Sequence, residues 1–324
     1  MIIVKISGGI GNQMFQYAMI YALQKQYPET KILADVSCYK LYDVHYGLEL
    51  NKIFHLDERA LLQIANIYEQ WVVRGEIPLF CGGKIGVLIE KPVAWINART
   101  RKLFERFGKR NVIKEETYLN RHETYDEGLK SLLYVVENLD LNKNWYIDGY
   151  WQNEIFFQNW FDDLRQIFVF PELVDYVNIK LAEAMQQANS VSVHIRRGDY
   201  VNSSFEILTD DYYRRAIEYI QKHVDNPIFY FFSEDRSYIQ SHFNWLDSKI
   251  IVDNNIGEQS FRDMQLMSIC KHNIVANSSF SAWAGFLNAN KDKIVVYPAK
   301  YRKHGEKYED NVKKLEDGWV MLDV

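Results

Sequence analysis

The sequence predicts an α/β protein of about two domains, built from parallel sheets that carry helices on both faces. Three observations support this prediction. The chain has 324 residues, more than a single domain of typical size. Its second half alternates apolar, strand-like runs with helical patterns, the order that produces parallel sheets. Its first half opens with the same strand–helix–strand order.

The first half begins with an apolar strand at 2–6, a glycine-rich loop at 7–11 and a helix over 12–26 that Pro28 ends. A strand at 31–34 follows and leads into Asp35. Residues 50–140 are less regular, although a strand at 145–147 and a helix over 154–168 are expected. A boundary at 170–172 gives an N-terminal domain, 1–170, and a C-terminal domain, 171–324.

The second half has the clearer pattern. Strands are expected at 191–195, 228–232, 249–252, 273–276 and 293–297. Apolar residues repeat at helical spacing from 209 to 224, with Thr209 as the N-cap and Pro227 beyond the end. A second helical stripe runs over 258–270. These elements predict the parallel sheet of the C-terminal domain.

Composition excludes several classes of protein. Lys plus Arg number 38 and Asp plus Glu 43, a net charge of −5, which argues against nucleic-acid binding. The cysteines Cys38, Cys81 and Cys270 are far apart and form no metal or disulfide pattern. The N-terminus lacks signal-peptide features, and no uncharged apolar run is long enough to span a membrane. We therefore expect a cytoplasmic protein.

One stretch, 99–114, concentrates seven basic residues around a single acid, Glu105. Two interpretations stay open. The stretch is a solvated helix face, or it is a basic patch that holds an anionic membrane surface or a phosphorylated acceptor. The second interpretation predicts peripheral contact with the inner face of a membrane.

Polar residues follow the expected strands at the edge where open α/β sheets bind ligands. They are Arg196-Arg197-Gly198-Asp199, Ser233-Glu234-Asp235, Asp253-Asn254-Asn255 and Asn277-Ser278-Ser279. Arginine pairs with phosphate oxygens in a bidentate manner, and a helix N-terminus holds an anion. A carboxylate can accept hydrogen bonds from guanine. The set predicts a nucleotide-diphosphate site in which arginine, rather than a divalent metal, neutralises charge, since no DxD-like motif is present.

The run His194-Ile195-Arg196-Arg197-Gly198-Asp199 is the strongest of these signals. Its alternative is a surface loop with a local Arg–Asp pair and a satisfied histidine, which two arginines at a buried strand end disfavour. Ser278 and Ser279 are expected to hold phosphate, with an ordinary helix N-cap as the alternative. Asp263 lies on the preceding helix, and its alternative is an exposed helix face.

The N-terminal loop imitates a dinucleotide fingerprint through Gly9, Gly11 and the acid Asp35. However, Met14 stands where the third glycine belongs and should hinder close helix–strand packing. Asn12 and Gln13 instead offer amide groups to a cleft. An NAD-dependent oxidoreductase that uses the Gly9–Asp35 unit is therefore kept as a less favoured alternative.

Four segments resemble the bacterial α-1,2-fucosyltransferase family (glycosyltransferase family 11). They are residues 7–17 (SGGIGNQMFQY), 194–200 (HIRRGDY), 263–281 (DMQLMS followed by NSSFS) and, more weakly, 149–152 (GYWQ). The second is shared with α-1,6- and protein O-fucosyltransferases. The run Ala282-Trp283-Ala284-Gly285 departs from the family's commoner Trp-Trp-Gly-Ala. Residues 60–140 match no motif, and acceptor choice is expected there.

The resemblance implies a GT-B-like fold, in which two Rossmann-like domains face a cleft, the N-terminal one on the acceptor side and the C-terminal one binding GDP-fucose. It also implies inverting transfer of L-fucose from GDP-β-L-fucose to the 2-hydroxyl of a galactoside, without an obligatory metal or other cofactor. The acceptor would be a galactose-containing glycan of a surface polysaccharide, with a lipid-linked form as one option. Carried over by position, Arg196 binds the diphosphate and Asn12 reaches the donor–acceptor junction, and these two are the catalytic candidates. The donor-binding candidates are His194, Arg197, Asp199, Asp263, Ser278, Ser279, Phe280, Gly9, Gly11 and Gln13.

No general base is singled out by the pattern. Asp148, Glu154 and Glu206 are conceivable. A non-catalytic protein that binds a sugar nucleotide or a glycan on the same scaffold remains the second alternative, because it would keep Arg196 and the serines.

Overall fold

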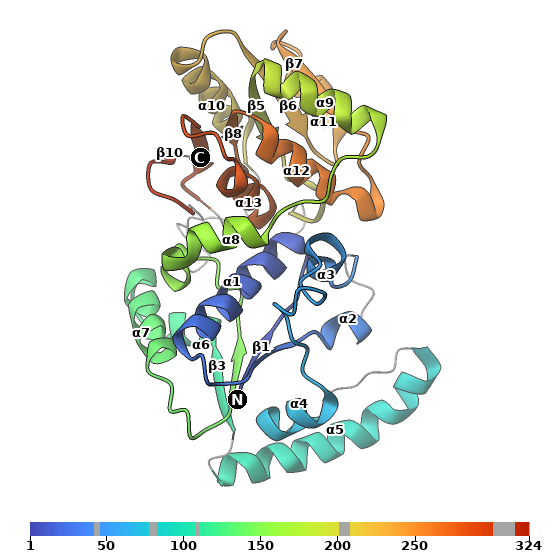
Figure 1. Ribbon diagram of the computed structural model, residues 1–324, viewed down its shortest axis with the longest axis vertical. Helices are drawn as coiled ribbons and strands as arrows, with labels where there is room; N and C mark the ends of the chain where they lie inside the picture. The colour runs from blue at the N-terminus through green and yellow to red at the C-terminus, as the bar shows by residue number, and fades with distance from the viewer. Residues whose placement is uncertain (42–45, 78–82, 108–109, 201–207, 301–314, 324) are drawn as a thin grey trace. The chain divides into compact units, whose positions relative to one another are not determined.

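The chain divides into two compact units, Met1–Val169 and Phe170–Val324. The computed structural model describes residues 1–41, 46–77, 83–107, 110–200, 208–300 and 315–323, with side chains except those of 40, 41, 83–90 and 199. Figure 1 shows the helices and strands of both units. Each unit is described by itself, as the N-terminal unit and the C-terminal unit.

Within its described residues, the N-terminal unit holds a four-stranded parallel sheet in the order β2-β1-β4-β3. The strands are β1 (Ile2–Lys5), β2 (Ile32–Asp35), β3 (Asn111–Lys114) and β4 (Trp145–Asp148). The helices are α1 (Ile10–Gln26), α2 (Cys38–Leu41), α3 (Glu49–Phe54), α4 (Ile67–Arg74), α5 (Gly83–Arg106), α6 (Glu115–Leu119), α7 (Tyr125–Glu137) and α8 (Phe161–Ile167), with 3-10 turns η1 (Glu154–Phe156) and η2 (Gln158–Trp160).

Helix α1 packs on β1 and β2 and is buried along nearly its whole length, with apolar side chains on most of its surface and two buried amides, Gln13 and Gln16. The other face of the sheet presents Ile3, Leu33 and Tyr146 to Ala65 and to Val73 of α4. Helix α5 lies on the outside of this unit beside α4 (Figure 1). The sheet is thus a buried parallel layer between helices, as predicted.

The C-terminal unit holds a six-stranded parallel sheet in the order β10-β9-β8-β5-β6-β7. Its strands are β5 (Asn189–His194), β6 (Pro227–Phe232), β7 (Lys249–Val252), β8 (His272–Ile274), β9 (Val295–Pro298) and β10 (Val320–Leu322). Its helices are α9 (Tyr176–Gln187), α10 (Asp210–His223), α11 (Arg236–His242), α12 (Phe261–Ile269) and α13 (Ser279–Leu287), with 3-10 turns η3 (Gly198–Tyr200) and η4 (Gly257–Gln259).

One face of this sheet forms a large core with α10 and α11. Val191, Val193 and Phe231 of the sheet pack there against Tyr213 and Ile217. Helices α9 and α12 pack at β5. The α/β class with helices on both sheet faces is confirmed. The Thr209 cap is also confirmed, since its hydroxyl accepts a hydrogen bond from the Tyr212 amide.

One expected element is wrong. Residues 154–168 do not form a single helix but two 3-10 turns followed by α8. Asn153 caps the first turn through the Ile155 amide, and Phe156 and Phe157 are drawn into the core. Tertiary packing of these rings therefore overrides the helical spacing. In the described part of the chain, no helix is both long enough and apolar enough to cross a bilayer.

Candidate functional site

The strand order of the C-terminal unit places the arginine loop at a topological switch point. β5 pairs with β6 on one side and with β8 on the other, so the chain moves outward in one direction and then returns to the opposite side. Ligands of open α/β sheets bind outside the carboxyl ends of the strands at such a point. The loops that flank it are Ile195–Gly198 after β5 and Val275–Ser278 after β8.

Both arginines of the first loop are tied to the loop that follows β6. Arg196 Nη1 lies 3.2 Å from Glu234 Oε1. Arg197 Nε lies 3.5 Å from Asp235 Oδ2, and its guanidinium stacks 3.9 Å from the centre of the Tyr238 ring. A Cβ at Gly198 would lie 2.5 Å from Glu234 Oε1, so a larger residue there would displace the Glu234 side chain from its present position.

His194 ends β5 and is 5% exposed. Burial lowers its pKa to about 3, and the positive charge of Arg196 adds to this effect. The imidazole is therefore neutral at physiological pH. Its Nδ1 is buried and has no hydrogen-bond partner among the described residues. An unpaired buried polar atom costs roughly 1–3 kcal/mol, which a ligand that completes the bond would relieve.

The loop after β8 reaches this edge through two contacts. The Tyr200 hydroxyl donates to the Asn277 carbonyl at 2.9 Å, and the Phe280 ring lies 5.7 Å from that of His194. Helix α13 begins at Ser279, and Ser278 at its N-cap makes no capping hydrogen bond with its side chain. The helix N-terminus, with its partial positive charge, is thus adjacent to the arginine loop.

Asp263 is half-buried at the start of α12 and accepts a 2.8 Å hydrogen bond from Asn255 Nδ2. Its pKa is raised to about 7, mainly by burial; the hydrogen bond from Asn255 opposes the shift, and the charges of Asp253 and Glu234 add to it. The carboxyl group titrates near neutrality and can accept or donate a hydrogen bond. An exposed helix face, the alternative for Asp263, is not what the structure shows.

In the N-terminal unit, the glycine loop after β1 is held by buried amides. Gly8 has φ +82°, and a Cβ there would meet the Asn12 amide at 2.6 Å. Gly9 is the N-cap of α1, and Gly11 is buried in its first turn. Gln13 is fully buried: its amide donates to the carbonyls of Gly8 and Gly47 and accepts from the Glu49 and Leu50 amides. Gln13, expected to face a ligand, instead holds the loop.

The block at residues 149–152 lies beside this loop, since β4 pairs with β1. Gln16 Nε2 donates to the Gly149 carbonyl at 3.0 Å. Gln152 Nε2 donates to Asn12 Oδ1 at 2.5 Å, so the candidate Asn12 is positioned from a second loop. Glu115 Oε2 accepts from the Tyr150 and Trp151 amides at 2.6 and 3.0 Å. Sequence reasoning missed Glu115, because no motif surrounds it.

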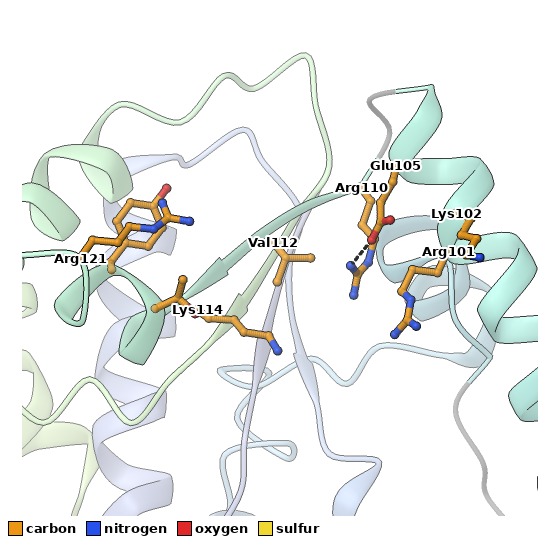
Figure 2. Close-up of a pocket in the computed structure, with 9 residues that line it drawn as sticks. Arg101, Lys102, Glu105, Arg110, Val112, Lys114 and Arg121 are labelled. Carbon is orange, nitrogen blue, oxygen red and sulfur yellow. Dashed lines mark hydrogen bonds and ion pairs between the residues drawn. The ribbon is translucent and has the colours of Figure 1, made fainter.

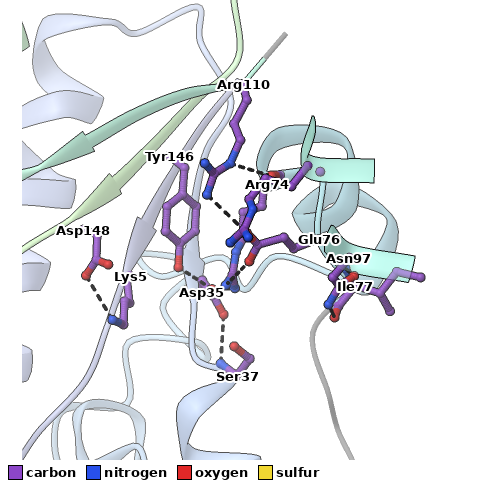
Figure 3. Close-up of polar contacts among 12 residues, drawn as sticks. Lys5, Asp35, Ser37, Arg74, Glu76, Ile77, Asn97, Arg110, Tyr146 and Asp148 are labelled. Atoms are coloured by element: carbon purple, nitrogen blue, oxygen red, sulfur yellow. Dashed lines mark hydrogen bonds and ion pairs between the residues drawn. The ribbon is translucent and has the colours of Figure 1, made fainter. Parts of the chain in front are cut away.

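Charged side chains end all four strands on one face of this sheet. They are Lys5, Asp35, Lys114 and Asp148, and Figure 3 shows the polar contacts of Lys5, Asp35 and Asp148. Lys5 pairs with Asp148 at 3.0 Å. Asp35 is 2% exposed and accepts from Arg74 Nη1 at 2.8 Å and from the Tyr146 hydroxyl at 2.7 Å.

These contacts weigh against the oxidoreductase alternative. The Asp35 carboxylate would have to accept from a ribose hydroxyl, yet it is enclosed by Arg74, Tyr146 and the Ser37 amide. The Met14 side chain is fully buried and fills the position where a Rossmann site uses glycine.

Three predictions fall on parts of the chain that are not described. The side chain of Asp199 and all of Glu206 and Cys81 lie outside the described residues. Of the conceivable bases, Asp148 is engaged by Lys5 and Glu154 begins η1. Among the described residues, no three His, Cys, Asp or Glu side chains cluster closely enough to hold a metal ion.

Comparisons with known proteins identify relatives along the chain. A family profile described as "Glycosyl transferase family 11" matches residues 79–323. The O-antigen biosynthesis glycosyltransferase WbnK of Escherichia coli is 31% identical over 336 residues, which cover 98% of this chain and 99% of that protein. An alpha-1,2-colitosyltransferase of Escherichia coli is 29% identical and covers 99% of both chains. Galactoside alpha-(1,2)-fucosyltransferase 2 of Pongo pygmaeus is 29% identical over 36% of this chain and 35% of its own length.

Proposed function

The chain belongs to glycosyltransferase family 11, and we propose that it transfers L-fucose from GDP-β-L-fucose to the 2-hydroxyl of a galactoside with inversion. The family assignment makes the protein a glycosyltransferase and confirms the resemblance that its motifs carry. The donor sugar and the acceptor are the proposed part. A lipid-linked acceptor at the cytoplasmic face of a membrane is the form of substrate that we favour.

The observation that carries the donor assignment is the edge at the β5–β8 switch point. An arginine, a neutral buried histidine with an unpaired Nδ1 and a helix N-terminus meet there. A diphosphate suits the arginine fork and the helix N-terminus. Asp263 and His194 are proposed to contact the guanosine, with Ser278, Ser279 and Phe280 beside the phosphates. Asp199 is proposed to hold the arginine loop.

The chemistry is a single in-line displacement. The acceptor 2-oxygen forms a bond to C1 of fucose while the bond from C1 to the GDP oxygen breaks, and GDP leaves with the electron pair. Negative charge grows on the diphosphate, and Arg196 is proposed to stabilise it most in the transition state. The hydroxyl proton passes to a base or to solvent, and we assign no residue to that step.

The relatives leave a choice between two donor sugars. One is named a colitosyltransferase and another a fucosyltransferase, and colitose is fucose without its 3-hydroxyl group. We propose fucose because the motif resemblance points to that family branch. The test offers GDP-fucose and GDP-colitose separately with a galactoside and identifies the products by mass and linkage. Faster transfer of colitose would overturn the choice of donor and leave the site assignment intact.

The non-catalytic alternative is tested in the same assay. It predicts GDP binding measurable by calorimetry, with no sugar transfer from either donor. The oxidoreductase alternative predicts binding of NADH, which the enclosed Asp35 disfavours.

A further inference from the structure

A basic pocket lies on the N-terminal unit where α5, β3 and α6 meet. Its volume is about 490 Å³, and Figure 2 shows the side chains around it. Its charged lining residues are Arg101, Lys102, Glu105, Arg110, Lys114 and Arg121. We call this the α5 pocket. None of the residues assigned to the donor from the motifs lines this pocket, and the basic stretch 99–114 has the two interpretations given above.

Positive charge in the α5 pocket exceeds what its acids neutralise. Glu105 pairs with Arg110 at 2.8 Å, while Arg110 and Arg101 share Glu76 at 3.2 and 3.7 Å. The other three cations, Lys102, Lys114 and Arg121, make no ion pair within the described residues. Such a pocket attracts phosphate groups, which guanidinium and ammonium groups bind with charge-assisted hydrogen bonds.

Large apolar side chains are exposed on the same helix. Trp95 is 57%, Leu103 51% and Phe107, just beyond the end of α5, 65% exposed. The Arg99 guanidinium stacks 3.6 Å from the centre of the Trp95 ring. Positions 95, 99, 102 and 106 follow at spacings of three or four residues, so they share one face of the helix. This face combines basic groups with an aromatic ring, the composition of helices that lie in a membrane interface.

The opposite face of α5 is fixed to the unit. Asn97 exchanges hydrogen bonds of 2.7 and 2.9 Å with the backbone of Ile77. The Thr100 hydroxyl donates to the Gly75 carbonyl at 2.6 Å, and the Phe104 ring lies 5.8 Å from that of Trp71. The basic and aromatic face is therefore held outward and cannot turn inward without breaking these contacts.

We propose that α5 and its pocket seat the protein on a bilayer that contains anionic phospholipid. Trp95 enters the headgroup region, and Lys102, Lys114 and Arg121 bind lipid phosphates. Charge complementarity selects this occupant, because a neutral surface would leave the cations unpaired. The inference rests on the proposed function only for the reason why such a contact is useful, which is access to a lipid-linked acceptor.

The test is sedimentation of the full-length protein with vesicles of phosphatidylcholine alone or mixed with phosphatidylglycerol. We expect binding to the mixed vesicles only, and weaker binding at high salt. Lys102→Glu and, separately, Arg121→Glu should each lower the partition coefficient about fivefold or more. Trp95→Ser should lower it as well. Lys130→Glu, an exposed lysine on α7, is the matched control and should bind like wild type.

Further arms of the experiment separate the possible sources of phosphate. Inorganic pyrophosphate is titrated by calorimetry, and transfer to a soluble galactoside is measured on every variant. Equal binding to both kinds of vesicle, or wild-type binding by Lys102→Glu and Arg121→Glu, would overturn the proposal. Pyrophosphate binding without vesicle binding would overturn it in favour of a soluble phosphorylated ligand. Unchanged transfer by variants that lose vesicle binding would support it and would leave the proposed function standing.

Discussion

Replacing Arg196 with alanine should abolish most sugar transfer while the protein stays folded. The guanidinium is 31% exposed, and its ion pair with Glu234 joins two loops at the sheet edge, outside the core. A partly exposed pair of this kind contributes about 0–1 kcal/mol to stability. For a protein of this size, such a loss lowers Tm by about 2–4 °C at most.

The effect on transfer should be much larger. Losing one group that stabilises charge in the transition state costs roughly 3–4 kcal/mol, or about 10²- to 10³-fold in kcat/KM. Arg196→Lys keeps the charge but loses the planar fork, so it should fall between wild type and alanine. Arg197→Ala should lower Tm more than Arg196→Ala, because its guanidinium packs on the Tyr238 ring.

The assay is GDP release with a galactoside acceptor, beside thermal melts of each variant. Arg215→Ala is the matched control, because Arg215 is 38% exposed and pairs with Asp211 at 2.8 Å on α10. That variant should lose a similar amount of stability and no activity. A folded Arg196→Ala protein that transfers at the wild-type rate would show that this loop does not bind the donor diphosphate.

Three further predictions concern other features. The pKa of Asp263 is raised to about 7. Its contribution to stability is therefore fully present below about pH 4 and is lost as the pH rises through 7. Asp263→Asn should flatten this part of the pH dependence of Tm, and an unchanged profile would refute the shift. Transfer should persist in excess EDTA, since arginine is proposed to neutralise the leaving group; loss of transfer restored by Mn²⁺ would contradict this. Glu115→Gln should lower the free energy of unfolding by about 1–3 kcal/mol, because the Tyr150 and Trp151 amides lose a charged acceptor. A variant that unfolds at the same urea concentration as the wild type would rule this out.

Features confined to a short stretch of chain could be predicted from the sequence. The strands of the C-terminal unit lie close to their expected ranges, because buried parallel strands are continuous apolar runs. The Thr209 cap and the loop after His194 were predicted for similar reasons, since each depends on neighbouring residues. Two capping boxes in the less regular region, Asn66 with Glu69 and Thr124 with Glu127, were equally readable signals.

Features that depend on distant residues were not predictable in this way. The partners of Arg196, Arg197 and Asn12 lie on other loops, and pairing of parallel strands decides which loops meet. Gln13 shows the limit most clearly. Its position in a motif suggests a ligand contact, yet three of the four hydrogen bonds that occupy its amide join it to residues 47–50. Asp35 likewise matches the acid of a dinucleotide-binding fingerprint in the sequence, yet in the structure Arg74 and Tyr146 enclose its carboxylate.

The most direct test of the central claim is transfer from GDP-β-L-fucose to a soluble galactoside, with the linkage of the product determined by NMR. We expect an α-1,2-linked fucose on galactose, formed by the wild-type protein and lost in Arg196→Ala. A product linked at another hydroxyl, or no product from wild-type protein that binds GDP, would contradict it.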